Sequence, residues 1–163
     1  MRIISGVYKG QSLPKIPVKG TRPTQARVRK SMLQILEPFT GKKVLDLFAG
    51  SGVLGIEAIS RGATSLVSVE NDRKMFKILN RNLAKICTDK PYEVFSMDAL
   101  SFIENCSQKF DIIFSDPPYS KYNYLDIFHK SKVLLKDGGV FCMEMRKTEV
   151  DETIFRKKVY GNT

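Results

Sequence analysis

Four apolar segments of the sequence each end in an acidic residue or precede one. Asp46, Glu70 and Asp116 close the runs VLD, LVSVE and FDIIFSD, and Asp98 follows YEVFSM. If these runs are parallel strands, the four carboxylates line one edge of a sheet, which is where such sheets bind ligands. A phosphate at this edge would be repelled, at roughly 1 to 4 kcal/mol for each like-charge contact at ~4 Å. The pattern therefore favours a cationic ligand rich in hydroxyl and amino donors.

A glycine-rich turn, GSGVLG at residues 50–55, follows the first of these runs. It fits the GxGxxG pattern, which serves any ligand that must approach the backbone closely, here at Gly50 and Gly52. S-adenosylmethionine suits the acidic surroundings, because it carries a sulfonium, an ammonium and two ribose hydroxyls but no phosphate. Its carboxylate would meet the helix N-terminus after Ser51, and Glu70 would accept both ribose hydroxyls. We therefore expect S-adenosylmethionine as the cofactor.

A second turn, SDPPYS at residues 115–120, offers hydrogen-bond acceptors and few donors. Its two prolines lack backbone N–H groups, which leaves Asp116 and the Pro117 carbonyl as acceptors. This suits an exocyclic amino group of a nucleobase, which becomes nucleophilic when its hydrogens are held out of the ring plane. Tyr119 would supply a flat surface for a base drawn out of its stack. A proline pair with an aromatic residue also ends ordinary strands, and the turn alone favours neither interpretation.

Strands and helices alternate beyond Gly41. Short runs rich in Val, Ile and Phe are typical of strands buried on both faces, and apolar spacings of three and four from Asn71 predict a helix. The alternation predicts right-handed crossovers and a doubly wound, mainly parallel sheet of the Rossmann-like α/β class. The predicted strands are residues 43–48, 65–70, 92–96, 110–115 and 139–145, and the predicted helical face is Met75, Phe76, Leu79, Leu83 and Ile86, with Lys74, Lys77 and Arg81 elsewhere.

The net charge of +10 is concentrated at the start of the chain. Residues 1–43 hold ten Lys and Arg against Glu37 alone, a net +9, whereas residues 44–163 hold seventeen against sixteen acidic residues, a net +1. So one-sided a block is typical of a segment that binds a polyanion. The candidates for phosphate contacts are Arg2, Lys9, Lys15, Lys19, Arg22, Arg27, Arg29 and Lys30.

The same region also differs in its apolar pattern. Residues 1–20 alternate apolar and polar residues and are broken by glycines and prolines, which predicts short strands or a hairpin outside the core. A helix is predicted between Thr24, a good N-cap, and Pro38. We therefore divide the chain into a basic extension, residues 1–40, and a core, residues 41–163. The apolar face predicted for the helix is Val28, Met32, Ile35 and Leu36.

Cysteine and histidine usage argues against a metal site or a disulfide framework. Cys87, Cys106 and Cys142 are widely separated, and His129 is the only histidine. No apolar run approaches the ~20 residues of a membrane span. We expect a cytoplasmic monomer that binds no metal and no membrane.

The segments DLFAGSGVLGIEAISRGA and DPPY resemble the class I methyltransferases that modify exocyclic amino groups. RIISGVYKG, TRPTQARVRKSM and the late RKKVYGN narrow the resemblance to the RsmD family of bacterial 16S rRNA guanine-N2 methyltransferases, over nearly the whole chain. The resemblance implies methyl transfer from S-adenosylmethionine to N2 of guanine 966, in the small ribosomal subunit or its assembly intermediates. It also implies that the extension faces the RNA.

The resemblance further implies a role for each matching residue. Asp98 would contact adenine by its side chain and Ala99 by its backbone, and residues 22–24 would close over the cofactor and face the RNA. Family members end in a hairpin whose last strand joins the sheet, and this sequence stops at the turn, residues 161–163, so we expect a truncated hairpin. The predicted catalytic residues are Asp116, Pro117, Pro118 and Tyr119, and the predicted cofactor-binding residues are Arg22, Pro23, Thr24, Asp46, Phe48, Ala49, Gly50, Ser51, Gly52, Glu70, Asn71, Asp98 and Ala99.

Three other functions share parts of this pattern. A DNA adenine-N6 methyltransferase has the same catalytic turn, but such enzymes generally carry a target-recognition region for which this chain has little room. A nicotinamide-dependent oxidoreductase would explain the glycine turn and Glu70, but not the DPPY turn, and the second nucleotide-binding half is missing. A non-catalytic RNA-binding protein with a methyltransferase-like fold would explain the basic extension.

Overall fold

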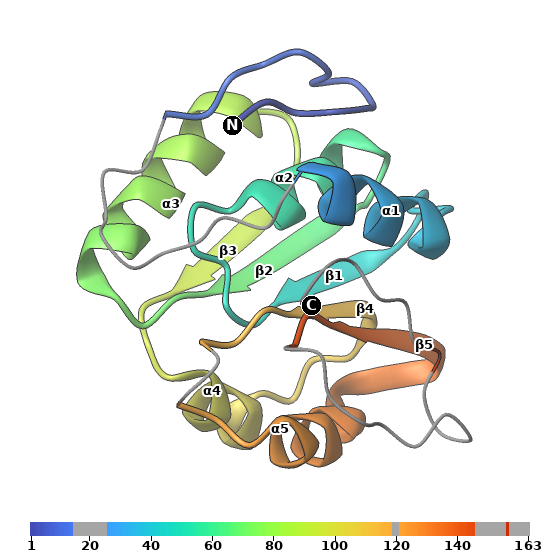
Figure 1. The fold of residues 1–163 in the computed structure, drawn as a ribbon, viewed down its shortest axis with the longest axis vertical. Coiled ribbons are helices and arrows are strands. Elements are labelled where there is room, and N and C mark those ends of the chain that lie inside the picture. Colours follow the sequence, from blue (N-terminus) through green and yellow to red (C-terminus); the bar gives the residue numbers. More distant parts are fainter. Residues whose placement is uncertain (15–25, 119–120, 146–155, 157–163) are drawn as a thin grey trace.

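The computed structural model describes residues 1–14, 26–118, 121–145 and 156 of the 163-residue chain. Its centre is a five-stranded sheet in which all neighbouring strands are parallel (Figure 1). The parallel, doubly wound α/β class predicted from the sequence is therefore confirmed. The strands lie in the order β3 (Tyr92–Phe95), β2 (Ser65–Val69), β1 (Lys43–Asp46), β4 (Phe110–Ser115) and β5 (Leu135–Met143).

Helices cover both faces of the sheet, because the buried strands direct alternate apolar side chains to opposite sides. Val44 of β1 lies in the core layer shared with α1 (Ala26–Leu36), α2 (Val53–Ser60) and α3 (Arg73–Ile86). Leu45 lies in the other layer, shared with α4 (Ala99–Asn105) and α5 (Tyr124–Ser131), and η1 (Lys132–Leu134) joins α5 to β5. Figure 1 shows the two helical layers on opposite sides of the sheet.

The strands follow the predicted runs, although β1, β2 and β3 each end one or two residues early, and the largest difference lies at the last strand. β4 spans the predicted residues 110–115, but β5 begins at Leu135, before the predicted run 139–145. Its pairing with β4 is irregular between Phe110 and Ile112, where Gly138 adopts a φ of +71°. The strand was predicted from an apolar pattern, which polar and glycine residues interrupt at 136–139. The prediction therefore missed the first part of β5.

Helix α3 confirms the predicted amphipathic face. Met75, Leu79 and Leu83 are buried, whereas Lys74, Lys77 and Arg81 are exposed and Phe76 is half-buried. The helix begins at Arg73 and not at Asn71, because the Asp72 side chain accepts hydrogen bonds from the backbone N–H groups of Lys74 and Met75, at 2.9 Å each. Buried Asn82, outside the predicted face, donates to the Ser51 carbonyl at 2.8 Å.

Residues 1–14 pack into the core, so the predicted appendage is wrong for this segment. Ile3, Tyr8 and Leu13 belong to the apolar cluster that contains α2 and α3. The antiparallel bridge between Arg2 and Ser12 agrees with the predicted hairpin, which packs on the core and not outside it. The Tyr8 N–H donates to Ser60 Oγ at 2.9 Å. Gly6 has a φ of +79°, and a Cβ there would lie 1.8 Å from the Ser60 carbonyl oxygen. Glycine is therefore required by close packing, which a local pattern does not reveal.

Helix α1 buries only part of the predicted face. Met32 and Leu36 pack against the core as predicted, but Ile35 is 43% exposed, and the fully buried positions belong to Leu33 and Arg29. The difference arises because Arg29 pairs with a buried carboxylate of α2, Glu57, so a charged residue takes an interior position that hydrophobic periodicity assigns to apolar residues. Thr24, the predicted N-cap, lies outside the described residues.

The predicted C-terminal hairpin falls on residues that the structure mostly does not describe, namely 146–155 and 157–163. Among the described residues, no helix is long and apolar enough to cross a membrane.

Candidate functional site

The strand ends meet at one edge of the sheet, as the sequence predicts for a parallel fold. Asp46 is the register partner of Ser68 in β2 and of Phe114 in β4. Just beyond β1, the Leu47 N–H donates to the Phe114 carbonyl and the Ala49 N–H to the Val69 carbonyl, at 3.0 Å each. The loop that follows β1 is therefore fixed between the carboxyl ends of β2 and β4.

Asp46 is a buried carboxylate beside two others. It is 1% exposed, and neither carboxylate oxygen has a hydrogen-bond partner among the described residues. Burial, followed by the charges of Asp116 and Glu70, raises its pKa to about 7, although the nearby N–H groups of Gly55 and Phe48 act in the opposite direction. The structure thus brings Asp46, Glu70 and Asp116 close enough to interact. A cation at this edge would relieve their repulsion.

Glu70, the predicted ribose-binding acid, accepts a hydrogen bond from the glycine turn. Its Oε2 accepts from the Gly50 N–H at 2.8 Å, and its Oε1 accepts from the Asp72 N–H at 2.7 Å. Burial raises its pKa, and these backbone N–H groups oppose the rise. Each oxygen keeps further acceptor capacity, so the carboxylate is oriented and still able to accept ligand hydroxyls. Asn71, next in the chain, is exposed.

The turn itself needs glycine at two positions. Gly50 and Gly52 have φ values of +53° and +80°, in the left-handed region. A Cβ on Gly52 would lie 2.5 Å from Cδ1 of buried Leu79. Ser51 is buried and its carbonyl is fixed by Asn82, while Phe48 is half-buried. Glycine at position 52 is therefore required by close packing against α3, whereas Gly50 is half-buried.

Asp98 and Ala99 lie at the start of α4, beyond β3. Oδ1 of Asp98 accepts from the Leu100 N–H at 2.9 Å and caps the helix, while Oδ2 accepts from the Tyr122 hydroxyl at 2.5 Å. Burial raises the pKa of Asp98, but the bonds from Tyr122 and from the backbone N–H groups outweigh it and leave the pKa below its usual value. The Ala99 side chain is buried in the core, which leaves its backbone for the predicted ligand contact.

Tyr122 is the site residue that the sequence did not indicate. Its ring meets Phe48 edge-on, with centroids 5.1 Å apart and planes at 66°. Burial raises its pKa, as do the hydrogen bond to Asp98 and the charge of Glu70. Tyr122 therefore contacts the acid predicted to hold the adenine. A tyrosine in a polar loop after the DPPY turn is no signal on its own, because only the fold brings it to Asp98.

The predicted catalytic turn follows β4 at the same edge. Asp116 is half-buried, Pro117 is buried and Pro118 is exposed. The Pro118 carbonyl accepts a hydrogen bond from the Lys121 N–H at 3.1 Å, just before Tyr122. Tyr119 and the predicted cofactor residues Arg22, Pro23 and Thr24 lie outside the described residues.

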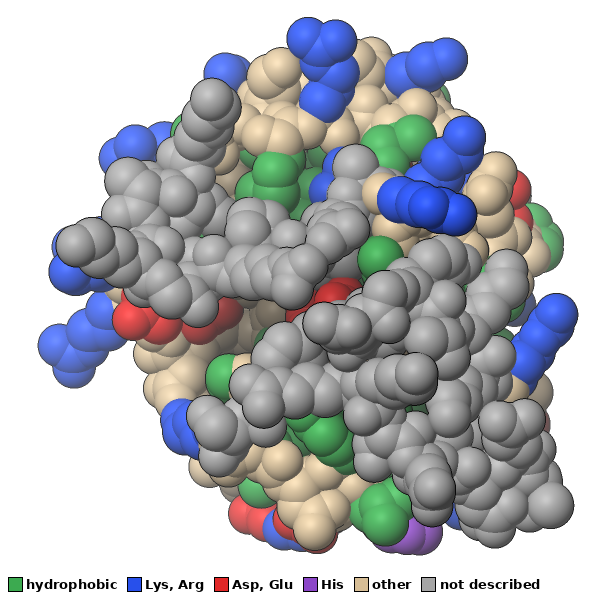
Figure 2. All heavy atoms as spheres, in the orientation of Figure 1, with side chains coloured by type: hydrophobic (Ala, Val, Ile, Leu, Met, Phe, Trp, Pro, Cys, Tyr) green, Lys and Arg blue, Asp and Glu red, His purple; other side chains and the backbone are tan. Residues whose placement is uncertain are grey.

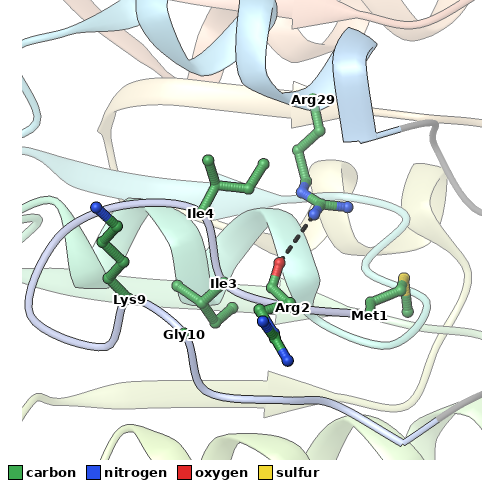
Figure 3. Close-up of a pocket in the computed structure, with 7 residues that line it drawn as sticks. All are labelled: Met1, Arg2, Ile3, Ile4, Lys9, Gly10 and Arg29. Carbon is green, nitrogen blue, oxygen red and sulfur yellow. Dashed lines mark hydrogen bonds between the residues drawn. The ribbon is translucent and has the colours of Figure 1, made fainter.

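A concave region of about 450 Å³ lies between the N-terminal segment and α1 (Figure 3). Arg29 reaches from α1 toward this segment and donates to the Arg2 carbonyl at 3.0 Å. Its Nε lies 3.6 Å from Oε1 of fully buried Glu57, which also accepts from the Ile4 N–H at 2.7 Å. Arg29 is 2% exposed, so its predicted phosphate contact is wrong: its charge is used inside the protein. Arg2 and Lys9, which also line the region, are exposed.

Comparison with known proteins gives the family. The family model described as Conserved hypothetical protein 95 matches residues 1–163. The chain belongs to this family. It is 36% identical to the ribosomal RNA small subunit methyltransferase D of Escherichia coli K12 over 140 residues, which cover 85% of this chain and 68% of that protein. It is 30% identical to the protein of the same name from Buchnera aphidicola (subsp. Acyrthosiphon pisum), over 96% of this chain and 86% of that protein.

A solved Escherichia coli structure, described as a candidate methyltransferase, has the same fold. Its TM-score is 0.81 at 32% identity, with 91% of this chain and 82% of that chain covered. The five parallel strands, the glycine turn after β1 and the family together make this chain a methyltransferase of the class I fold. The RsmD resemblance drawn from the sequence is thus confirmed.

Proposed function

We propose that this protein transfers a methyl group from S-adenosylmethionine to the exocyclic N2 of a guanine in 16S rRNA. The observation that carries the proposal is the group of carboxylates at the carboxyl edge, where Asp46, Glu70 and Asp116 interact beside the glycine turn. Its relatives named ribosomal RNA small subunit methyltransferase D support rRNA as the substrate. Guanine 966 is the target that the family resemblance implies.

The residues at this edge fit S-adenosylmethionine, which supplies an electrophilic methyl group on a sulfonium. The buried Asp46 carboxylate lacks hydrogen-bond partners among the described residues, and a cationic ligand would stabilise its charge. Glu70 is oriented by Gly50 and Asp72 to accept ribose hydroxyls. The carboxylates disfavour a pyrophosphate by the same Coulomb term that favours a cation. Phe48 and Tyr122 would border the adenine beside Asp98.

The catalytic turn would act on the target amine as a pair of acceptors. Asp116 and the Pro117 carbonyl would hold the amino hydrogens, which favours a pyramidal nitrogen with its lone pair toward the methyl group. Alignment of the two reactants supplies most of the acceleration in such a transfer. The turn needs no strong base, because the nitrogen becomes acidic only as the new bond forms.

The N-terminal segment and α1 would contribute to RNA binding. Arg2 and Lys9 are exposed at the concave region, and Arg27 and Lys30 are exposed on α1. None of the four takes part in an ion pair or hydrogen bond through its side chain within the described residues. Figure 2 shows Lys and Arg side chains over this part of the surface. The small subunit as the physiological substrate, the monomeric state and the cytoplasmic location stay predictions.

A methyl-transfer assay with labelled S-adenosylmethionine tests the proposal. We expect transfer to small ribosomal subunits that lack the modification, and none to duplex DNA. Asp116→Ala should lower turnover by at least 100-fold with cofactor affinity within a few-fold, because the lost acceptor is needed mainly as the amine becomes pyramidal. Asp137→Ala, at an exposed acid of β5, is the control and should retain full activity. Transfer to DNA would reassign the substrate.

A further inference from the structure

Helix α3 carries a row of positive charge that the sequence-wide count conceals. The helix contains five Lys and Arg and no acidic residue. Four of them, Arg73, Lys77, Arg81 and Lys85, recur every four residues, and all four are exposed. We call these four residues the α3 basic stripe. Residues four apart are neighbours on a helix surface, and twelve residues of rise make the stripe about 18 Å long.

The stripe is unfavourable for an isolated helix. Like charges at a spacing of four residues repel each other. Arg73 lies in the first turn, where the helix dipole disfavours cations, and that turn holds no acidic residue. Within the described part of the chain, no stripe residue takes part in an ion pair or hydrogen bond through its side chain. Among the residues that the structure describes, the four charges are therefore without an ion-pair partner.

The stripe connects the candidate site with the N-terminal segment. At one end, the Asp72 N–H just before Arg73 donates to Glu70 at 2.7 Å, which places this end at the carboxyl edge of the sheet. At the other end, Asp89 follows α3 and accepts a hydrogen bond from the Tyr8 hydroxyl. Figure 1 shows α3 beside the N-terminal segment, and Figure 2 shows Lys and Arg side chains projecting on that side.

We propose that the α3 basic stripe binds the phosphate backbone of the substrate RNA beside the target nucleotide. This inference rests on the proposed function and names a second RNA-binding surface, outside the N-terminal 43 residues where the net charge lies. Over this length the four charges can contact several successive phosphates of one strand. RNA whose target base enters at the carboxyl edge can thus continue along α3 toward Lys9.

An anionic membrane is the other partner that a basic helix face can suggest. Helices that lie on membranes insert an apolar face into the lipid, but the apolar face of α3 is already buried. Met75, Leu79 and Leu83 are each 5% exposed or less, in the core of the domain. The stripe thus offers charge without an insertable surface, which favours a soluble polyanion.

A triple substitution tests the stripe: Lys77→Gln, Arg81→Gln and Lys85→Gln. The matched control is Lys109→Gln, Lys130→Gln and Lys132→Gln, which removes the same charge around α5, in the other helical layer. Both variants are compared with the wild type for the KM of small-subunit methylation between 50 and 200 mM salt, for S-adenosylmethionine affinity and for melting temperature. Glutamine suits an exposed helix position, and the loss of like-charge pairs should keep or slightly raise the melting temperature.

We expect the stripe variant to raise the KM for small subunits about tenfold and to lower the slope of log affinity against log salt by roughly 2. Its cofactor affinity and its kcat at saturating substrate should stay within twofold of the wild type, and the control should change none of these. If the stripe variant has the same KM and salt dependence as the control while the wild type is active, the proposed role of the stripe is overturned and the proposed function stands. A wild type that transfers no methyl to small subunits overturns both. Stripe-dependent binding to phosphatidylserine vesicles, with unchanged small-subunit KM, overturns the assignment to RNA.

Discussion

The Tyr122 hydroxyl donates a hydrogen bond to Oδ2 of Asp98 at 2.5 Å, while its ring meets Phe48 edge-on. This contact joins the loop after the catalytic turn to the start of α4. It fixes the Asp98 carboxylate from one side while the α4 backbone fixes it from the other. Any ligand that reaches Asp98 therefore also meets Tyr122.

Tyr122→Phe should weaken S-adenosylmethionine binding about threefold to tenfold, since about 1 kcal/mol of hydrogen bonding that orients Asp98 is lost. The pKa of Asp98 should rise toward its usual value, because the Tyr122 bond lowers it. Calorimetric titration measures the affinity. Tyr92→Phe, at the amino end of β3 and so away from the carboxyl edge, is the control. Equal affinities for the two variants would place the adenine away from Tyr122.

Asp46 should make both stability and cofactor binding depend on pH. Its pKa is about 7 in the folded protein, against about 4 in an unfolded chain. Between these values the native state holds a proton that the unfolded state has lost, so stability falls as pH rises from about 4 to about 7. Asp46→Asn should abolish this part of the decline, seen as a smaller difference in melting temperature between pH 5.5 and pH 8.

Titration of Asp46 should change cofactor affinity in the opposite direction to stability, so that affinity rises as pH rises. A cationic ligand prefers the charged carboxylate, so wild-type affinity for S-adenosylmethionine should improve roughly tenfold between pH 6 and pH 8. The affinity of Asp46→Asn should be nearly flat across this range, whereas exposed Asp137→Asn should keep the wild-type profile. Identical profiles for wild type and Asp46→Asn would mean that the sulfonium and ammonium bind elsewhere.

Two adjacent cations of α1 should behave differently. Arg29→Met should lower the free energy of unfolding by about 3 kcal/mol, because it leaves Glu57 buried with a weaker set of partners. Lys30→Met, at an exposed position, should change it by less than about 0.5 kcal/mol. Urea titrations give both values. Conversely, Lys30→Met should weaken RNA binding, and Arg29→Met should not while the protein remains folded. Equal stabilities would show that the Arg29–Glu57 pair is not needed for folding.

Gly52→Ala should destabilise the protein more than Gly41→Ala does. Both glycines have a similar positive φ, +80° and +79°, so both substitutions carry the ~1 to 2 kcal/mol cost of that conformation. Only at Gly52 would the new Cβ approach another residue, Leu79, at 2.5 Å. We expect an additional loss of about 1 to 3 kcal/mol and weaker cofactor binding for Gly52→Ala alone. Matching urea midpoints for the two variants would mean that Leu79 moves aside freely.

The sequence predicted those features that a regular pattern encodes. The run FDIIFS matched β4 residue for residue, since a strand buried on both faces is a continuous apolar run. The carboxyl-edge acids were predictable because parallel topology brings strand ends together. The sequence did not predict the positions of three other residues, because each depends on a partner far along the chain. Arg29 pairs with Glu57, Ile3 packs in the layer of α2, and Tyr122 donates to Asp98. The α3 basic stripe was hidden because a count over residues 44–163 cancels charges that the fold separates.

The identity of the methylated nucleoside tests the central claim most directly. Small ribosomal subunits lacking the modification are incubated with the protein and labelled S-adenosylmethionine, and the 16S rRNA is digested to nucleosides for mass spectrometry. We predict that the label appears in N2-methylguanosine and that Asp116→Ala lowers its rate of appearance by at least 100-fold. Label in N6-methyladenosine, or cofactor binding without any transfer, would contradict the account.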